Sequence, residues 1–201
     1  MAKPKLALIP AAQGTKLYSV LPSNGTGDFD FTRGSVATRI NAQGLIENVA
    51  SGQSRLDYPL IDGVQKGCPH HILEPARTNI LSYSEDFSNS FWNKGGSSII
   101  SNTSISPDGG LNADKLVQDT SSGVHKIVKP YTGISGTNTC SIFVKPDGVT
   151  KIGISSTESV SVLSSFDLSN GTLISSLSDD YSITSFADGW FRISSTDIGG
   201  N

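Results

Sequence analysis

The sequence predicts a mainly β protein, in which an extended N-terminal arm and a small turn-rich segment precede an antiparallel β-sandwich. Three observations support this class. Charged residues make up 16% of the chain, against about 25% in typical globular domains. From residue 97 onward, apolar and polar residues alternate with a period of two, as half-buried strands require. Pairs of Asp or Asn followed by Gly separate several of these runs, which is typical of hairpin turns.

Residues 1–28 are expected to form an extended arm, because they hold two short apolar patches and a flexible turn. The first patch includes Leu6, Leu8 and Ile9, and the second is centred on Tyr18. Neither patch can form a core alone, so ordering this segment requires a surface to lie against. That surface belongs either to the rest of the chain or to a neighbouring subunit.

Residues 29–77 are expected to form a compact, turn-rich segment that serves docking or assembly. Phe29 and Phe31 alternate with a polar residue, as in a strand. The segment also holds four arginines and four carboxylates that can pair with them: Arg33, Arg39, Arg55 and Arg77, with Asp30, Glu47, Asp57 and Glu74. The guanidinium group suits paired contacts with carboxylates at interfaces. The two interpretations are an ordered network of ion pairs or ordinary solvated surface charge.

Residues 78–96 form a joint between this segment and the part that follows. Ser84 is placed to cap a short helical turn, with two acidic residues at its positive end. Phe87, Phe91 and Trp92 come next, so one side of the joint is strongly apolar. We expect Trp92 to anchor the core rather than to bind a ligand.

Residues 97–201 are predicted to contain many short strands at spacings of about 8 to 12 residues, the pattern of a sandwich or jelly roll. The expected strands cover residues 97–105, 113–119, 123–131, 138–147, 151–157, 161–168, 171–177, 181–187 and 189–196. Four turn pairs separate strands within this region: Asp108-Gly109, Asp147-Gly148, Asn170-Gly171 and Asp188-Gly189. Ser and Thr are expected to face outward.

No pattern of catalytic residues stands out, and the sequence favours a protein that is not an enzyme. It lacks a nucleophile elbow, a phosphate-binding glycine loop and a zinc-ligand spacing. No cofactor is expected. Asp179 and Asp180 either bind a structural calcium ion or simply form a solvated acidic turn.

Nucleic-acid binding and membrane insertion are not expected either. The formal net charge is −3, no run of Lys or Arg occurs, and no apolar run approaches the length of a membrane span. The first twelve residues imitate a signal peptide, but their apolar run is short and contains a proline, so we expect a mature N-terminus. Cys68 and Cys140 are expected to be reduced thiols, made in a cytoplasm.

Binding of sugar requires an aromatic platform with a few polar groups nearby. The candidates are Tyr131, Tyr181 and Trp190. Trp190 and its neighbour Phe191 are adjacent on an expected strand, so one of the two faces away from the core. Trp190 either stacks on a sugar or packs inward, and the second alternative is favoured.

Three phrases resemble virion proteins of tailed bacteriophages, which include tail fibres, head fibres and minor structural proteins. They are FDFTRGSVATRINAQGLIENV with RLDYP, CPHHILEPARTNILSYSEDFSNSFWNK, and CSIFVKPDG with the later FDLSNGTLIS and ADGWFRISST. The resemblance covers residues 28–198. It implies that residues 97–201 form a jelly roll similar to carbohydrate-binding modules. Since such jelly rolls usually continue for another strand pair, either a longer native protein or another chain is expected to complete it.

The resemblance therefore implies a structural component of a phage virion, assembled in the bacterial cytoplasm and docked through residues 1–77. Its expected partners are other virion proteins and its own copies, with a trimer favoured. Host-surface glycans are further candidate partners, because the alternative function is a carbohydrate-binding module for host adhesion.

Overall fold

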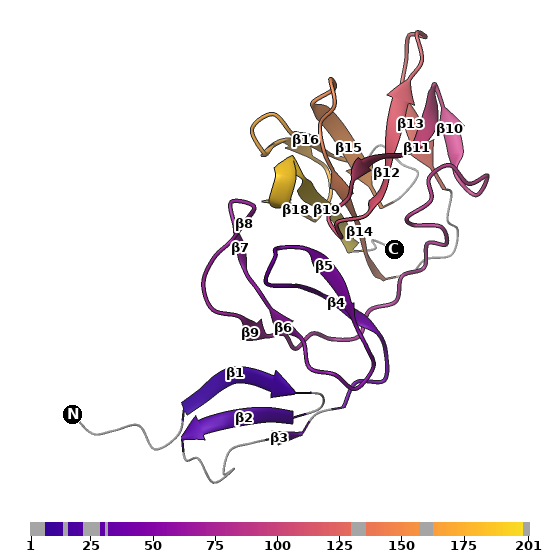
Figure 1. Ribbon diagram of the computed structural model, residues 1–201. Coiled ribbons are helices and arrows are strands. Elements are labelled where there is room, and N and C mark those ends of the chain that lie inside the picture. Colours follow the sequence, from indigo (N-terminus) through magenta and orange to yellow (C-terminus); the bar gives the residue numbers. More distant parts are fainter. Residues whose placement is uncertain are drawn as a thin grey trace. The chain divides into compact units, whose positions relative to one another are not determined.

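The computed structural model describes residues 7–13, 16–21, 29–30, 32–129, 136–156 and 163–198. These residues confirm the expected class: the protein is mainly β, its sheets are antiparallel, and it has almost no helix. The chain packs as two units, residues 1–77 and residues 78–201. We call them unit 1 and unit 2 and describe each by itself (Figure 1).

Unit 1 begins with a three-stranded antiparallel sheet in the order β1-β2-β3. The strands are β1 (Ala7–Gln13), β2 (Lys16–Leu21) and β3 (Phe29–Asp30). The described part of the expected arm is therefore a hairpin with a short third strand. Figure 1 shows these three strands side by side.

The rest of unit 1 consists of three short two-stranded ladders joined by turns. They pair β4 (Ala37–Ile40) with β5 (Ile46–Val49), β6 (Leu56–Asp57) with β9 (His70–His71), and β7 (Leu60–Ile61) with β8 (Val64–Gln65). Ladders of two to four residues supply little stability by themselves. Side-chain contacts to the backbone are therefore important in this unit.

Unit 2 begins with a chain of turns that carries an aromatic cluster. Phe87 and Trp92 have ring centroids 5.3 Å apart, Phe91 and Trp92 5.4 Å, and Tyr83 and Phe91 5.7 Å. The indole N–H of Trp92 donates to the backbone carbonyl of Tyr83 at 2.9 Å. The expected apolar side of the joint is thus present.

The expected helical turn capped by Ser84 is not present; residues 82–91 form successive turns. Asp86, rather than Ser84, organises them, because its carboxylate accepts from the Ser88 hydroxyl and from the backbone N–H of Asn89. The Ser84 hydroxyl instead accepts from the side-chain amide of Asn79. A carboxylate is a stronger hydrogen-bond acceptor than a hydroxyl, which explains why Asp86 rather than Ser84 accepts these hydrogen bonds.

Two two-stranded ladders follow in unit 2. One pairs β10 (Asn93–Gly95) with β13 (Lys126–Val128), and the other is the long hairpin of β11 (Ser97–Ile105) and β12 (Leu111–Gln118). The turn of this hairpin contains Asp108-Gly109, as the sequence predicts.

Two three-stranded antiparallel sheets complete unit 2. One has the order β14-β19-β18 and contains β14 (Thr137–Val144), β18 (Asp180–Ser185) and β19 (Phe191–Ile198). The other has the order β15-β16-β17 and contains β15 (Lys151–Ser155), β16 (Leu163–Asp167) and β17 (Thr172–Ser176). A single core joins them, made of Val144 and Ile193 from the first sheet and Ile154, Phe166 and Leu168 from the β15–β16 side.

A cluster of serine hydroxyls accompanies this apolar core. Ser164 is fully buried, and its hydroxyl lies 2.9 Å from that of Ser176, 2.7 Å from that of Ser178 and 3.2 Å from that of Ser195. Because Ser164 belongs to one sheet and Ser195 to the other, the cluster links the two. Buried hydroxyls are tolerated when they are hydrogen-bonded in this way.

One predicted hairpin is wrong. The turn at Asp147-Gly148 does not join paired strands, because β14 pairs with β19 and β15 pairs with β16. The turn carries the chain from one sheet to the other instead. The local signal for a tight turn was correct, but the pairing of the strands depends on distant partners.

Candidate docking site

Arg33 binds the backbone of a neighbouring turn. Its Nη2 donates to the carbonyls of Val49, Ala50 and Gln53 at distances between 2.5 and 3.1 Å. Its own carbonyl accepts from the backbone N–H of Gly52 and from the Ser51 hydroxyl, both at 2.8 Å. One arginine therefore fixes residues 49–53 through hydrogen bonds to the backbone.

The same guanidinium has further donors that are not used. Its Nε and Nη1 are buried and have no hydrogen-bond partner among the residues that the structure describes. Burial, together with the nearby charge of Arg55, lowers the pKa of Arg33. Buried donors without a partner cost stability, so a group that supplied acceptors here would be bound favourably.

Arg39 and Glu47 form an ion pair across the β4–β5 ladder. The Arg39 Nε lies 2.6 Å and its Nη2 2.5 Å from the same carboxylate oxygen of Glu47. The amide of Asn41 donates to the other oxygen at 3.1 Å. The pKa of Glu47 is lowered, chiefly by the hydrogen bond from Asn41 and then by Arg39, while partial burial opposes the shift.

Arg55 also forms an ion pair in unit 1. Its Nη2 lies 2.8 Å from a carboxylate oxygen of Glu74, and its Nη1 donates to the carbonyl of Thr38 at 3.1 Å. Arg77 is exposed, and the hydrogen bond described for it goes to the carbonyl of its neighbour Ala76. Two of the expected pairs of arginine and carboxylate are thus present, Arg39–Glu47 and Arg55–Glu74. Arg33 binds backbone carbonyls instead of a carboxylate.

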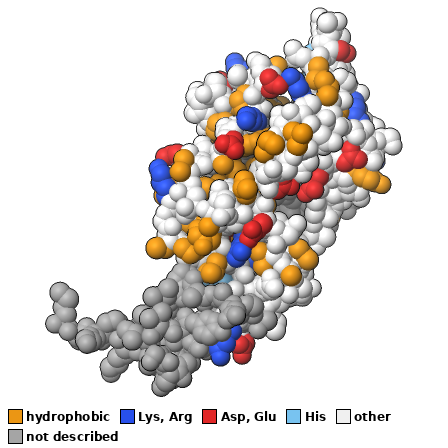
Figure 2. Space-filling model, viewed as in Figure 1, with side chains coloured by type: hydrophobic (Ala, Val, Ile, Leu, Met, Phe, Trp, Pro, Cys, Tyr) orange, Lys and Arg blue, Asp and Glu red, His pale blue; other side chains and the backbone are white. Residues whose placement is uncertain are grey.

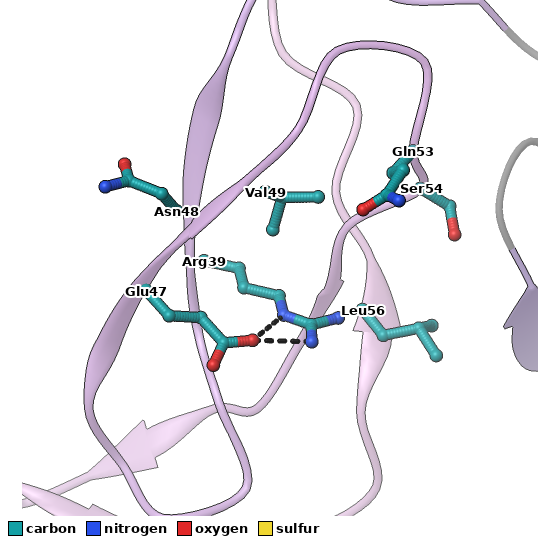
Figure 3. A pocket seen from close by; sticks show the side chains of 7 residues that line it. All are labelled: Arg39, Glu47, Asn48, Val49, Gln53, Ser54 and Leu56. Carbon is teal, nitrogen blue, oxygen red and sulfur yellow. Dashed lines mark hydrogen bonds and ion pairs between the residues drawn. The ribbon is translucent and has the colours of Figure 1, made fainter.

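An open hollow of about 200 Å³ lies beside the Arg39–Glu47 pair. Figure 3 shows the ion pair on one side, Leu56 near the guanidinium, and the amide of Gln53 above. The complete lining is Arg39, Glu47, Asn48, Val49, Gln53, Ser54 and Leu56. A space of this size accepts one side chain of a partner, and its polar walls can orient that side chain.

Unit 1 buries few apolar side chains. Within residues 32–77, which the structure describes continuously, Val49 is the one buried hydrophobic residue. Four others are more than half exposed: Val36, Ile61, Val64 and Leu73. Figure 2 likewise shows hydrophobic side chains at the described surface.

Two of the exposed apolar residues lie at the tip of the β7–β8 hairpin. Ile61 and Val64 are cross-strand partners, and they are 52% and 55% exposed. The turn between them is well defined, because both of its residues adopt a positive φ, as a two-residue hairpin turn requires. Leu60 at the base of the hairpin lies against Gly44, so the next residue, Ile61, projects outward.

The remaining residues expected at the docking site lie in the N-terminal part of unit 1. Leu8 and Ile9 belong to β1, Tyr18 to β2 and Phe29 to β3. Leu6 and Phe31 lie outside the described residues. The expected role of this set in docking stays a prediction.

The structure describes two of the three residues expected to bind sugar, Tyr181 and Trp190. Tyr131 lies outside the described residues. Tyr181 is 44% exposed on β18, whereas Trp190 is 9% exposed and its indole N–H donates to the carbonyl of Ile105 at 3.1 Å. Trp190 therefore packs inward, the favoured alternative, and ties the end of β11 to the start of β19.

The acidic turn before β18 supports the backbone. The carboxylate of Asp179 accepts from the N–H of Ile198 at 2.7 Å, and that of Asp180 accepts from the N–H of Tyr181 at 2.8 Å. Within the described ranges, no group of three potential metal ligands occurs.

Sequence reasoning missed one surface of unit 2. The side of the β14-β19-β18 sheet that points away from the core carries six hydroxyl residues and one arginine, Arg192. The alternation of Ser and Thr with apolar residues predicted that hydroxyls would face outward, which is wrong for the fully buried Ser164 and Ser195. It could not show that three distant strands would bring them onto one face.

Comparisons with protein-family profiles, curated proteins and solved structures give no match. Among the described residues, no helix is long and apolar enough to cross a membrane. The candidate site is therefore interpreted from its own geometry.

Proposed function

We propose that this protein is a non-enzymatic structural component of a bacteriophage virion, either a fibre or a decoration of the capsid or tail surface. Unit 1 docks it to other virion proteins, and unit 2 is displayed as a jelly-roll β-sandwich. The resemblance of residues 28–198 to virion proteins supports the class. The two sheets of unit 2, which share one core, are compatible with the jelly roll.

The observation that carries the docking role is the construction of unit 1. Arg33, Arg39 and Arg55 hold its turns in place through carbonyls and carboxylates, while four of its described apolar side chains are more than half exposed. Exposed apolar groups and a polar, open hollow are both features of an interface. Among these exposed groups, Ile61 and Val64 share the well-defined hairpin tip.

The first experiment deletes residues 1–28 in the phage that carries the protein and measures incorporation into purified particles. We expect incorporation to be lost, since the apolar patches of this segment need a surface to cover them. Normal incorporation of the truncated protein would refute a docking role for these residues.

The second experiment replaces the apolar tip with Ile61→Ser/Val64→Ser. We expect particle content to fall by about tenfold or more, because two side chains that become buried contribute about 1.5 to 3 kcal/mol each. The matched control is Leu111→Ser/Val124→Ser, which removes two exposed apolar side chains from unit 2. Equal losses in both variants would contradict docking through unit 1.

We further propose that the protein assembles as a homo-oligomer, with a trimer favoured by the resemblance to fibres. Light scattering of the purified full chain tests this directly. A strictly monomeric chain, both free and released from particles, would contradict it.

A further inference from the structure

We propose that the Arg77–Thr78 peptide bond is a processing site, at which a trypsin-like serine protease cuts the folded chain and separates unit 1 from unit 2. The site goes beyond the structural role proposed above and does not depend on it. Two features of the fold point to this bond: the exposure of the segment that contains it, and the protection of the other basic residues.

The segment around this bond is open to solvent and has no regular structure. Residues 73–80 are exposed without interruption and form no helix, strand or turn. None of residues 73–79 makes a backbone–backbone hydrogen bond with another described residue. Pro75 lacks an N–H and keeps the residue before it extended. An extended peptide is recognised through its main-chain hydrogen bonds, so this segment can enter a protease without first losing any of its own.

Both ends of the segment are held by side chains. At one end, a carboxylate oxygen of Glu74 lies 2.8 Å from Arg55 Nη2. At the other end, the side-chain amide of Asn79 donates to the Ser84 hydroxyl at 3.1 Å. Between them, the hydrogen bond described for the Arg77 guanidinium goes to the carbonyl of the preceding residue. The Arg77 side chain is therefore available to the acidic pocket with which a trypsin-like protease binds a basic residue.

The fold protects the other basic residues of residues 32–129, 136–156 and 163–198. Six lie within strands: Arg39, Lys94, Lys115, Lys126, Lys151 and Arg192. Two precede a proline, which is a poor substrate because its ring fixes φ and removes the N–H: Lys129 and Lys145. Three have a backbone group bonded to another segment: Arg33, Arg55 and Lys66. In these ranges, Arg77 is thus the one basic residue that has neither kind of protection.

The bond lies at the boundary between the two units. The apolar core of unit 2 is formed by residues between 144 and 193, and the Arg39–Glu47 and Arg55–Glu74 ion pairs both precede the cut. Cleavage at this bond therefore removes none of these contacts, and each product keeps its own. Exposed segments between stable units are the preferred sites of cleavage in folded proteins.

The reaction is hydrolysis of a peptide bond. The serine hydroxyl of the protease attacks the carbonyl carbon of Arg77, the bond to the nitrogen of Thr78 breaks, and that nitrogen takes up a proton and leaves as an amine. Water then attacks the ester that joins Arg77 to the protease, which releases the Arg77 carboxylate and restores the serine. The protease supplies the catalytic groups, and this chain supplies the substrate.

Limited digestion of the folded 201-residue chain with trypsin tests the site, with mass spectrometry of the products at early times. Within residues 32–198, we expect the first cut to fall between Arg77 and Thr78. Arg77→Gln should slow the first cut in this range at least about tenfold, because an uncharged side chain leaves the acidic pocket of the protease unpaired. Arg77→Lys should be cut at the same bond, since trypsin accepts both cations.

Lys66→Gln is the matched control, because it removes another exposed positive charge from unit 1. Its digestion should match that of the unaltered chain, and tryptophan fluorescence should show that residues 78–201 stay folded after the cut. A first cut elsewhere in residues 32–198, an unchanged rate in Arg77→Gln, equal slowing in Lys66→Gln, loss of cleavage in Arg77→Lys, or immediate degradation of residues 78–201 would overturn the proposal. Since none of these measurements involves particles, they are independent of the docking experiments.

Discussion

Glu47 shows how a single residue can make unit 1 sensitive to acid. Its carboxylate accepts from Asn41 and from Arg39, and these partners lower its pKa in the folded protein. A lowered folded pKa stabilises the protein above the pKa of the unfolded chain. That contribution is lost as the pH falls through the folded value.

We therefore predict that Glu47→Gln makes the β4–β5 region less stable at neutral pH, and that the difference from the unaltered chain disappears well below pH 4.5, the ordinary value for glutamate. Amide hydrogen exchange of Thr38 and Asn48, measured across this pH range, checks the prediction. Glu85→Gln is the control, since Glu85 is exposed. A difference between Glu47→Gln and the unaltered chain that stayed constant with pH would contradict the mechanism.

At the scale of elements, the positions of turns were easier to predict from the sequence than the pairing of strands. Asp108-Gly109 and Asn170-Gly171 each join strands that pair with one another, as their sequences indicate. Asp147-Gly148 has the same local signal but connects two sheets. A turn of two residues determines the local backbone, whereas the partner of a strand is decided by contacts far away in the sequence.

Gly171 is more tightly constrained than its turn type alone requires. A Cβ at this position would lie 2.8 Å from Phe191 Cε1, and its φ is +68°. Gly148 has a similar φ of +85°, but a Cβ added there would meet no atom within 4 Å. Substitutions at these two glycines can therefore distinguish the cost of backbone strain from the cost of a steric clash.

We predict that Gly148→Ala lowers the free energy of unfolding by about 1 kcal/mol, the cost of a positive φ. Gly171→Ala should cost about 1 to 3 kcal/mol more, because Phe191 packs against the core and must move. Urea denaturation of both variants checks this. Equal costs would show that the Phe191 ring moves freely.

At the scale of the whole molecule, each of the two units is stabilised internally by a different kind of interaction. Unit 2 contains the apolar core of Val144, Ile154, Phe166, Leu168 and Ile193, whereas the described part of unit 1 depends on arginine contacts. Apolar burial is the main source of folding free energy, so unit 2 has its own source of stability.

We therefore predict that residues 78–201 alone unfold cooperatively in urea. Both tryptophans of the chain, Trp92 and Trp190, belong to this unit. Their fluorescence should show a transition at nearly the same urea concentration in the fragment and in the full chain. A fragment with no cooperative transition, or one shifted to much lower urea, would show that unit 2 needs unit 1.

The amino-acid sequence by itself determined the class and the places of most strands. The expected runs at 97–105, 151–157, 161–168 and 171–177 each contain an observed strand, because alternation with a period of two is a property of neighbouring residues. The apolar side of the joint was predictable because Phe87, Phe91 and Trp92 lie close together in the sequence.

Only the tertiary structure decided which strands pair, where Trp190 points and which residues share a surface. Sequence left both directions open for Trp190, and the carbonyl of Ile105, 85 residues away, satisfies its indole N–H in the inward position. Arg192 likewise joined Ser141 and Thr184 only when β14, β18 and β19 aligned. The physical reason is common to both: packing and hydrogen bonding between distant segments depend on the whole arrangement, whereas alternation depends on adjacent residues alone.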